Sequence, residues 1–208
     1  MNKELKLEQI YEDIMLMQHK LSSKEKKEFQ SSKCVLYSGD VNYKTLVIGK
    51  DLGWSELKQS IPLIDKSGKF FRLIESQMNL SSFITVAVPF KASTHKGFSQ
   101  EIRIKFRPFI KEIIRTIDPK SIILLGNEAL SLMTDNCSGI MSWSQEDPVY
   151  WQCGDKSYNT FATVHPSFLT MKDITYQSLK TNHQHKKMFK EFFFRNFLKA
   201  HQFAGNIK

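Results

Sequence analysis

Four short apolar runs, each leading into a glycine or a polar segment, limit what this chain can fold into. The runs are TLVIG (45–49), FITVAVP (83–89), SIILLG (121–126) and TFATV (160–164). Continuous apolar runs of this length are typical of strands buried in a parallel sheet. Helical patterns separate them, such as SGKFFRLIESQMN and SQEIRIKFRPFIKEIIRTI. The chain is therefore predicted to be an α/β protein, a three-layer α/β/α domain with a central, mostly parallel four-stranded sheet.

The first 30 residues have a different character. Residues 2–30 are charged and carry a narrow apolar stripe at helical spacing, made by Leu7, Ile10, Ile14 and Met17. We therefore expect an N-terminal helical extension over residues 1–33, followed by one α/β domain over residues 34–208. No internal repeat, low-complexity tract or proline-rich linker indicates a further domain.

The charge balance favours an anionic partner. Thirty Lys and Arg against 21 Asp and Glu give a formal net charge of +9, and nucleic acid is the commonest partner of such a chain. No apolar run is long enough to span a membrane, and the N-terminus is too charged for a signal peptide. We expect a soluble, cytoplasmic monomer. Its three cysteines, Cys34, Cys137 and Cys153, form no C-x-x-C pair and indicate neither a disulfide framework nor a four-cysteine metal site.

Asp51 follows the first apolar run, in the segment GKDLG. Ligands of open α/β sheets bind at the carboxyl ends of the parallel strands, so an acid in that loop is a candidate for chemistry. The alternative is that Asp51 caps the helix that follows. The continuations of the other strands, PFKASTHKG, GNEA and HPSF, should gather at the same edge of the sheet.

Taken in order, these segments resemble the uracil-DNA glycosylase superfamily. The resemblance rests on GKDLG, PLIDKSGKFFRLI, FITVAVPFKAS, KFRPFI with IDPKSIILLGNEA, and FATVHPSFL, and it runs from about Val41 to Phe193. It implies a monofunctional DNA glycosylase that hydrolyses the N-glycosidic bond of a flipped uracil or modified pyrimidine. Such an enzyme would serve base-excision DNA repair or defence against modified foreign DNA, such as that of phage.

The resemblance also implies the catalytic residues. Asp51 falls on the aspartate of a G-Q-D motif, where a carboxylate orients water and stabilises the sugar cation. His165 matches the histidine of H-P-S, where it stabilises charge on the departing base. Pro166 and Ser167 fall on the loop that pinches the DNA backbone, and Phe168 follows as a wedge. Base flipping is required because the scissile bond is out of reach inside stacked duplex.

The implied base pocket departs from the family. Gly49 and Lys50 precede the catalytic acid, and Gly53 replaces a tyrosine that crowds the C5 side of the base. Leu63 stands where a base-stacking phenylalanine is usual, and Val86 where an asparagine reads the uracil edge. These changes leave a modified pyrimidine open as the substrate. They also favour the alternative of a DNA-binding protein that has lost catalysis on the same scaffold.

The basic loops are interpreted as DNA contacts. Lys91, Lys96 and Arg103 are expected to neutralise phosphates. His95, in THKGFS, matches the register of a histidine in a class that becomes covalently trapped on DNA, where a histidine can act as nucleophile. A phosphate contact explains His95 equally well, and we favour that role.

The iron–sulfur class of the superfamily has cluster cysteines in two contexts where this chain has Phe90 and Phe106. We therefore expect no cluster, no metal and no other cofactor.

Overall fold

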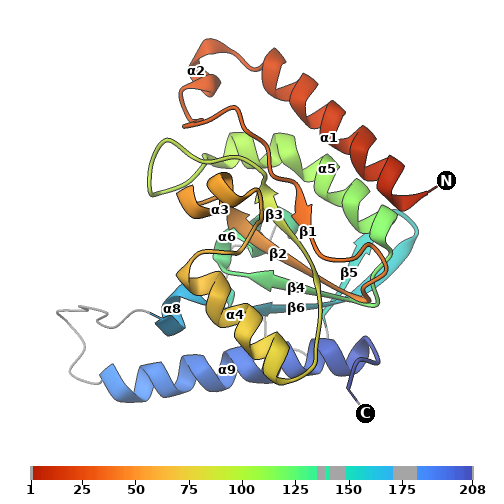
Figure 1. Cartoon of the computed structure of the whole chain (residues 1–208), viewed down its shortest axis with the longest axis vertical. Coiled ribbons are helices and arrows are strands. Elements are labelled where there is room, and N and C mark those ends of the chain that lie inside the picture. The colour runs from red at the N-terminus through yellow and green to blue at the C-terminus, as the bar shows by residue number, and fades with distance from the viewer. Residues whose placement is uncertain (1, 135–138, 141–148, 171–181, 208) are drawn as a thin grey trace.

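The computed structural model describes residues 2–134, 139–140, 149–170 and 182–207. Its sheet has six strands in the order β1-β3-β2-β4-β6-β5 (Figure 1). The strands are β1 (Tyr37–Ser38), β2 (Thr45–Asp51), β3 (Phe83–Val88), β4 (Ser121–Leu125), β5 (Val149–Cys153) and β6 (Lys156–Thr163). The four central strands β3, β2, β4 and β6 are parallel, and each edge carries one antiparallel strand.

The predicted class is confirmed, and the four predicted strands form the centre of the sheet. The expected count of four strands is too low because two short edge strands were missed. β1 pairs with β3 through two residues, which is too short to give an alternating pattern. β5 forms a hairpin with β6, whose turn contains Gly154 with φ +66°.

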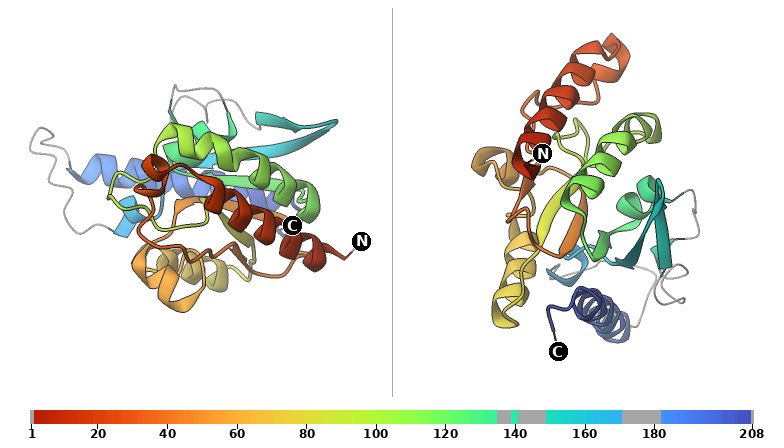
Figure 2. Two further views of the ribbon diagram at one scale, coloured as in Figure 1. Left: turned by 90° about the horizontal axis from the view of Figure 1, so that it is seen from above. Right: turned by 90° about the vertical axis from the view of Figure 1, so that its right-hand side faces the viewer.

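Helices cover both faces of the sheet (Figure 2). On one face, α5 packs on β3 and α6 packs on β2, β3 and β4. On the other face, α9 packs on β4 and β6, and α4 lies beside it. The helices are α1 (Lys3–Lys20), α2 (Ser23–Lys26), α3 (Trp54–Gln59), α4 (Lys66–Gln77), α5 (Gln100–Ile117), α6 (Asn127–Met133), α8 (Ser167–Thr170) and α9 (Asn182–Phe203). None of the helices, as far as the structure describes them, is long and apolar enough to span a membrane.

The N-terminal helix α1 packs against α5. Leu7, Ile10 and Ile14 are buried and belong to the same apolar cluster as the strands. Lys3 Nζ also donates a hydrogen bond of 2.7 Å to Ile117 O at the end of α5. The apolar stripe of this helix is therefore a part of the protein core.

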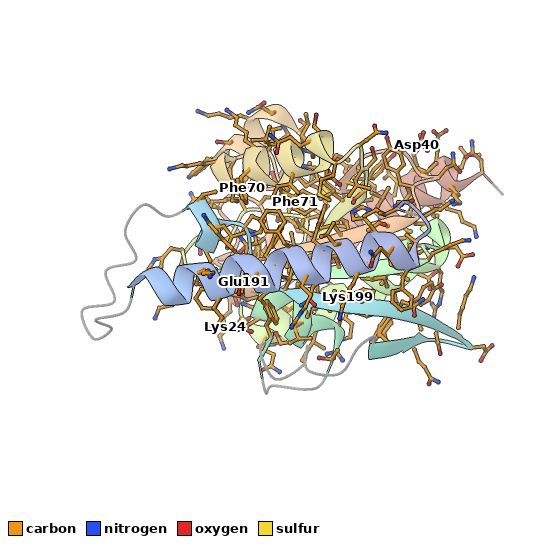
Figure 3. All side chains as sticks on the ribbon, turned by 90° about the horizontal axis from the view of Figure 1, so that it is seen from below. Lys24, Asp40, Phe70, Phe71, Glu191 and Lys199 are labelled. Carbon is orange, nitrogen blue, oxygen red and sulfur yellow. The ribbon has the colours of Figure 1, made fainter. Side chains whose placement is uncertain are left out.

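Aromatic side chains join α4 to α9. The ring of Phe71 packs edge-on against Phe197 at 5.5 Å, and Phe193 stacks on Phe197 at 5.8 Å. Figure 3 shows Phe71 beside α9. All three rings are fully buried. This aromatic packing holds α4 against α9 on this face of the sheet.

Candidate active site

A cavity of about 510 Å³ lies at the carboxyl ends of the parallel strands. Segments after β2, β3, β4 and β6 and the segment between α3 and α4 all contribute to it. Most of the residues predicted for the site line it together. These are Gly49, Lys50, Asp51, Gly53, Leu63, Val86, Lys91, His95, His165, Ser167 and Phe168. Lys96, Arg103 and Pro166 do not line it.

Asp51 is the last residue of β2, in register with Val88 of β3. It does not cap the next helix, because the N-cap of α3 is Gly53 and Glu56 accepts the Gly53 N–H. Among the described residues, no donor forms a hydrogen bond with the Asp51 carboxylate. The capping interpretation is therefore wrong, and this carboxylate is free to act on a ligand.

The charge state of Asp51 depends on several neighbours. Burial raises the pKa of Asp51, and the positive charges of Lys50, Lys91 and Arg103 oppose that rise. The negative charge of Glu128 raises the pKa further. The arrangement places an ionisable carboxylate in a partly desolvated cavity with cations around it, where its charge acts strongly on a nearby ligand.

His165 follows β6 and is held by the turn that it begins. The backbone N–H of Ser167 donates to His165 Nδ1 at 3.2 Å, and Ser167 Oγ lies 2.9 Å from the same nitrogen. Because Nδ1 accepts a backbone N–H, the proton of the neutral ring is on Nε2. Burial lowers the pKa of His165, which favours the neutral form. His165 can therefore donate a hydrogen bond from Nε2.

Glu56 and Leu63 belong to what we call the α3–α4 wall, formed by Glu56, Leu63, Asp65 and Gly68. The Glu56 carboxylate accepts the N–H of Gly53 and, at 2.5 Å, the N–H of Leu63. Leu63 is buried with φ +53°, a conformation that costs free energy in a residue with a Cβ. The bound carboxylate therefore supports a strained residue in the cavity.

Asp65 and Gly68 complete the α3–α4 wall. Asp65 caps α4, accepting the N–H of Gly68 at 2.9 Å and the hydroxyl of Ser67 at 2.7 Å. A Cβ on Gly68 would lie 2.0 Å from Leu63 O. Only glycine fits at this position, because the atom it would strike belongs to the backbone.

On another side of the cavity lies what we call the β2 wall, formed by Lys50, Asp51, Gly97 and Glu128. Here charged side chains contact one another, whereas in the α3–α4 wall the carboxylates bind backbone N–H groups. Lys50 Nζ lies 3.2 Å from Glu128 Oε1 and donates to Lys96 O at 3.1 Å. Gly97 has φ +84°, and a Cβ there would lie 2.5 Å from Lys50 Cε and 2.9 Å from Asp51 Oδ2. The loop after β3 therefore approaches the acid through a glycine.

The predicted DNA contacts lie around the cavity. His95 and Lys96 are exposed, Arg103 is partly exposed and Pro166 is buried. Phe168 is 39% exposed, and its ring lies 6.1 Å from that of Phe189 in α9. Phe168 therefore lies at the edge of the cavity, and its role as a wedge stays a prediction.

Sequence reasoning missed Glu56, Asp65, Thr94 and Glu128 of the cavity lining, and the close approach of Gly97. Two of these carried a readable signal. Glu56 comes three residues after Gly53, the spacing of a helix capping box. Glu128 follows the third buried strand in GNEA, where an acid is a site candidate by the same rule that selected Asp51.

Comparison with known proteins identifies the family. The family model for the Uracil DNA glycosylase superfamily matches residues 36–194, which is most of the chain. This protein therefore belongs to the uracil-DNA glycosylase superfamily, a family of DNA glycosylases. No curated protein matches it significantly. The resemblance found in the sequence is confirmed, and a family of DNA glycosylases fits DNA as the partner.

The residues present do not fit the iron–sulfur cluster of one class in this superfamily. Such a cluster takes four cysteine thiolates, and the chain has three cysteines. Phe90 and Phe106 are fully buried with their rings 5.8 Å apart, and Phe29 packs edge-on against Phe90 at 5.3 Å. Burial also raises the pKa of the Cys34 thiol to about 12. Aromatic packing occupies this region of the fold.

Proposed function

We propose that this protein is a monofunctional DNA glycosylase that hydrolyses the N-glycosidic bond of a flipped uracil or modified pyrimidine. The observation that carries the proposal is the placement of Asp51 and His165 in one cavity. They come from the ends of β2 and β6, with β4 between these strands. An anionic group and a neutral hydrogen-bond donor in one site suit a reaction that separates a sugar cation from an anionic base.

Asp51 acts on the sugar. As the bond between C1′ and the base nitrogen lengthens, positive charge develops on the sugar ring, and the carboxylate stabilises that charge. The same carboxylate accepts a hydrogen bond from the attacking water and orients it toward C1′. No donor among the described residues bonds to it, which supports this role because both oxygens can then bind water and sugar.

His165 acts on the leaving base. A pyrimidine that departs with the bonding electrons carries negative charge on its carbonyl oxygens, and the Nε2–H of a neutral imidazole can donate to one of them. The hydrogen bond from the Ser167 N–H supports this role by fixing the tautomer. The lowered pKa of His165 keeps the ring neutral at neutral pH.

The lining of the cavity supports a base other than unmodified uracil. Val86 is 2% exposed and offers no hydrogen bond to a pyrimidine edge. Gly53, where the resemblance places the C5 side of the base, has no side chain of its own, and the Glu56 carboxylate lies 3.0 Å from where a Cβ would stand. Leu63 gives an apolar contact in place of an aromatic stack. These lining residues fit a pyrimidine with a C5 substituent better than a pyrimidine that is recognised only by hydrogen bonds to its edge.

The test is a panel of oligonucleotides that carry uracil, thymine, hydroxymethylated or glycosylated pyrimidines, single-stranded and double-stranded. Each is incubated with excess protein and scored for abasic sites. We expect the parent protein to form abasic sites in an oligonucleotide that carries a modified pyrimidine. The His165→Ala variant should form none on the same oligonucleotide. A panel without any abasic product, under conditions where the protein binds the oligonucleotides, would contradict the enzymatic proposal.

A second candidate is a protein that traps DNA covalently through His95. His95 lines the same cavity as Asp51, which is the observation that favours it. In that reaction a ring nitrogen of His95 bonds to C1′ as the base leaves, and no water is consumed. A heat-stable protein–DNA adduct, lost in His95→Ala, would establish this alternative. We expect His95→Ala to weaken binding moderately and to leave cleavage in place.

A further inference from the structure

One charged contact in the β2 wall joins three segments that are far apart in the sequence. Lys50 comes from the end of β2, Glu128 from the first turn of α6, and Lys96 from the loop after β3. Lys50 Nζ lies 3.2 Å from the Glu128 carboxylate and 3.1 Å from Lys96 O. The side chains of Lys50 and Glu128 are 24% and 35% exposed, so this is a half-buried ion pair inside the cavity.

The loop that this contact holds lies directly against the catalytic acid. Thr94 O accepts the Gly97 N–H at 3.1 Å, which closes the turn over residues 94–97. The α-carbon of Gly97 is close enough to Asp51 that a Cβ would lie 2.9 Å from Oδ2. Glu28 accepts the N–H groups of Ser93 and Ser99, each at 2.7 Å, on either side of this turn. Removing the bond to Lys96 O would therefore loosen the 94–97 turn next to Asp51 and leave the ends of the loop in place.

We propose that Glu128 is a positioning residue, which acts through Lys50 to hold the 94–97 loop against Asp51. Glu128 attracts the Lys50 ammonium away from Asp51 and leaves it pointing at Lys96 O. The Asp51 carboxylate then forms no direct ion pair with any residue that the structure describes, and it stays available to water and sugar. The catalytic part of this inference rests on the role of Asp51 in the proposed function.

Charges from every neighbouring segment act on Asp51. Lys50 is on the same strand, Lys91 lies on the loop after β3, and Arg103 is on α5; the His95 side chain lines the same cavity. Glu56 is on α3, and Glu128 is on α6. Among these groups, all of them in the described part of the chain, Lys50 and Glu128 form an ion pair. Their charges are opposite, so removing one or the other has opposite electrostatic effects on Asp51.

The opposite signs give a test that a merely structural role would not pass. In a profile of excision rate against pH, the acid limb is the range where the rate falls as the pH drops. Glu128 raises the pKa of Asp51, so Glu128→Gln should move this acid limb to lower pH. Lys50 lowers that pKa, so Lys50→Met should move the limb to higher pH. His165 responds with the same signs to both residues. The predicted directions therefore hold whichever of the two groups forms the limb.

The experiment measures single-turnover excision against pH for the parent, Glu128→Gln, Lys50→Met and the double variant. Each single variant should lose about 10- to 100-fold in rate, as expected when a reacting group is displaced slightly. The limbs should shift in opposite directions by about half a pH unit. The matched control is Glu112→Gln, which removes an exposed ion pair with Arg115 on α5 and should match the parent.

Amide hydrogen exchange of the free protein provides a second readout. The Gly97 amide should exchange faster in Glu128→Gln and in Lys50→Met than in the parent or in Glu112→Gln. Unchanged exchange in both variants, or limbs that shift in the same direction, would overturn the proposal. Hydrogen exchange needs no substrate, so it tests the loop contact independently of catalysis. If the parent protein excised no base, the proposed function would be contradicted, and the exchange rates would still support or overturn the loop contact.

Discussion

The β2 wall holds Asp51 with its carboxylate unbonded by the described residues, whereas the α3–α4 wall holds Glu56 with its carboxylate bound to two backbone N–H groups. Burial raises the pKa of both acids. The perturbed pKa therefore does not distinguish the acid that we propose to be catalytic from the acid that supports the backbone. The hydrogen bonds do, because a carboxylate already used by the backbone has little capacity left for a substrate.

The same contrast holds for two glycines. A Cβ on Gly68 would strike the backbone of Leu63, and a Cβ on Gly97 would strike the side chains of Lys50 and Asp51. One wall is therefore fixed by backbone packing and the other by contacts among functional groups. Substitutions in the first should reduce stability, and substitutions in the second should reduce activity.

The largest effect on stability is expected for Gly68→Ala. A Cβ placed 2.0 Å from Leu63 O forces the backbone at the start of α4 to move. We expect a loss of about 3 kcal/mol or more in the free energy of unfolding. Denaturant unfolding monitored by circular dichroism measures it. Unfolding at the parental midpoint would show that the α3–α4 wall is not held by backbone packing.

Gly97→Ala should instead act on the rate. The added methyl group displaces the ends of Lys50 and Asp51, and displacement of a reacting group by about 1 Å can cost about 100-fold. Stability should fall by only about 1 kcal/mol, from the left-handed backbone. Single-turnover excision and denaturant unfolding are compared on one preparation. A stability loss as large as that of Gly68→Ala would remove the contrast between the walls.

Glu75 of α4 should make the free energy of unfolding depend on pH. Burial raises its pKa to about 7, so the neutral form is favoured in the folded state. Stability from this group is complete below the unfolded value near 4.5 and is lost as pH rises toward 7. Glu75→Gln should therefore stabilise the protein by about 2 kcal/mol at neutral pH and have little effect in acid. An equal effect at both pH values would contradict this assignment.

Glu56→Gln should have the smallest effect of the series, and on stability alone. The amide keeps one acceptor oxygen and loses the second, so one of the N–H groups of Gly53 and Leu63 loses its partner. The expected cost is about 1.5 kcal/mol. Excision by the folded protein should stay near the parental rate. A rate loss of the size expected for Gly97→Ala would make Glu56 part of the chemistry.

The fold and the centre of the site could be predicted because their signals are local. Continuous apolar runs mark the parallel strands, and the position of Asp51 and His165 after two of them places both at one edge of the sheet. The edge strand β1 was missed because a strand of two residues is too short to show an alternation of apolar and polar side chains. The role of Gly97 was missed because its constraint comes from Lys50 and Asp51, which only the folded chain brings close.

The functions of the carboxylates could not be predicted from the sequence for a related reason. Asp51 and Glu56 are five residues apart, and the sequence left a helix-capping role open for Asp51. The structure separates them, because Gly53 is the N-cap of α3 and Glu56 bonds back to it. Hydrogen-bond partners that decide a role, such as the Leu63 N–H, become visible only when the loop conformation is known.

The central claim is that the Asp51 carboxylate carries the chemistry, and Asp51→Asn tests it most directly. The amide keeps the shape of the side chain and removes its charge. Single-turnover excision on the preferred base should fall by about 10²- to 10³-fold, the usual loss for a preorganised group at a developing charge. DNA affinity and unfolding should match the parent. Excision by Asp51→Asn at the parental rate would contradict the account and remove Asp51 from the mechanism.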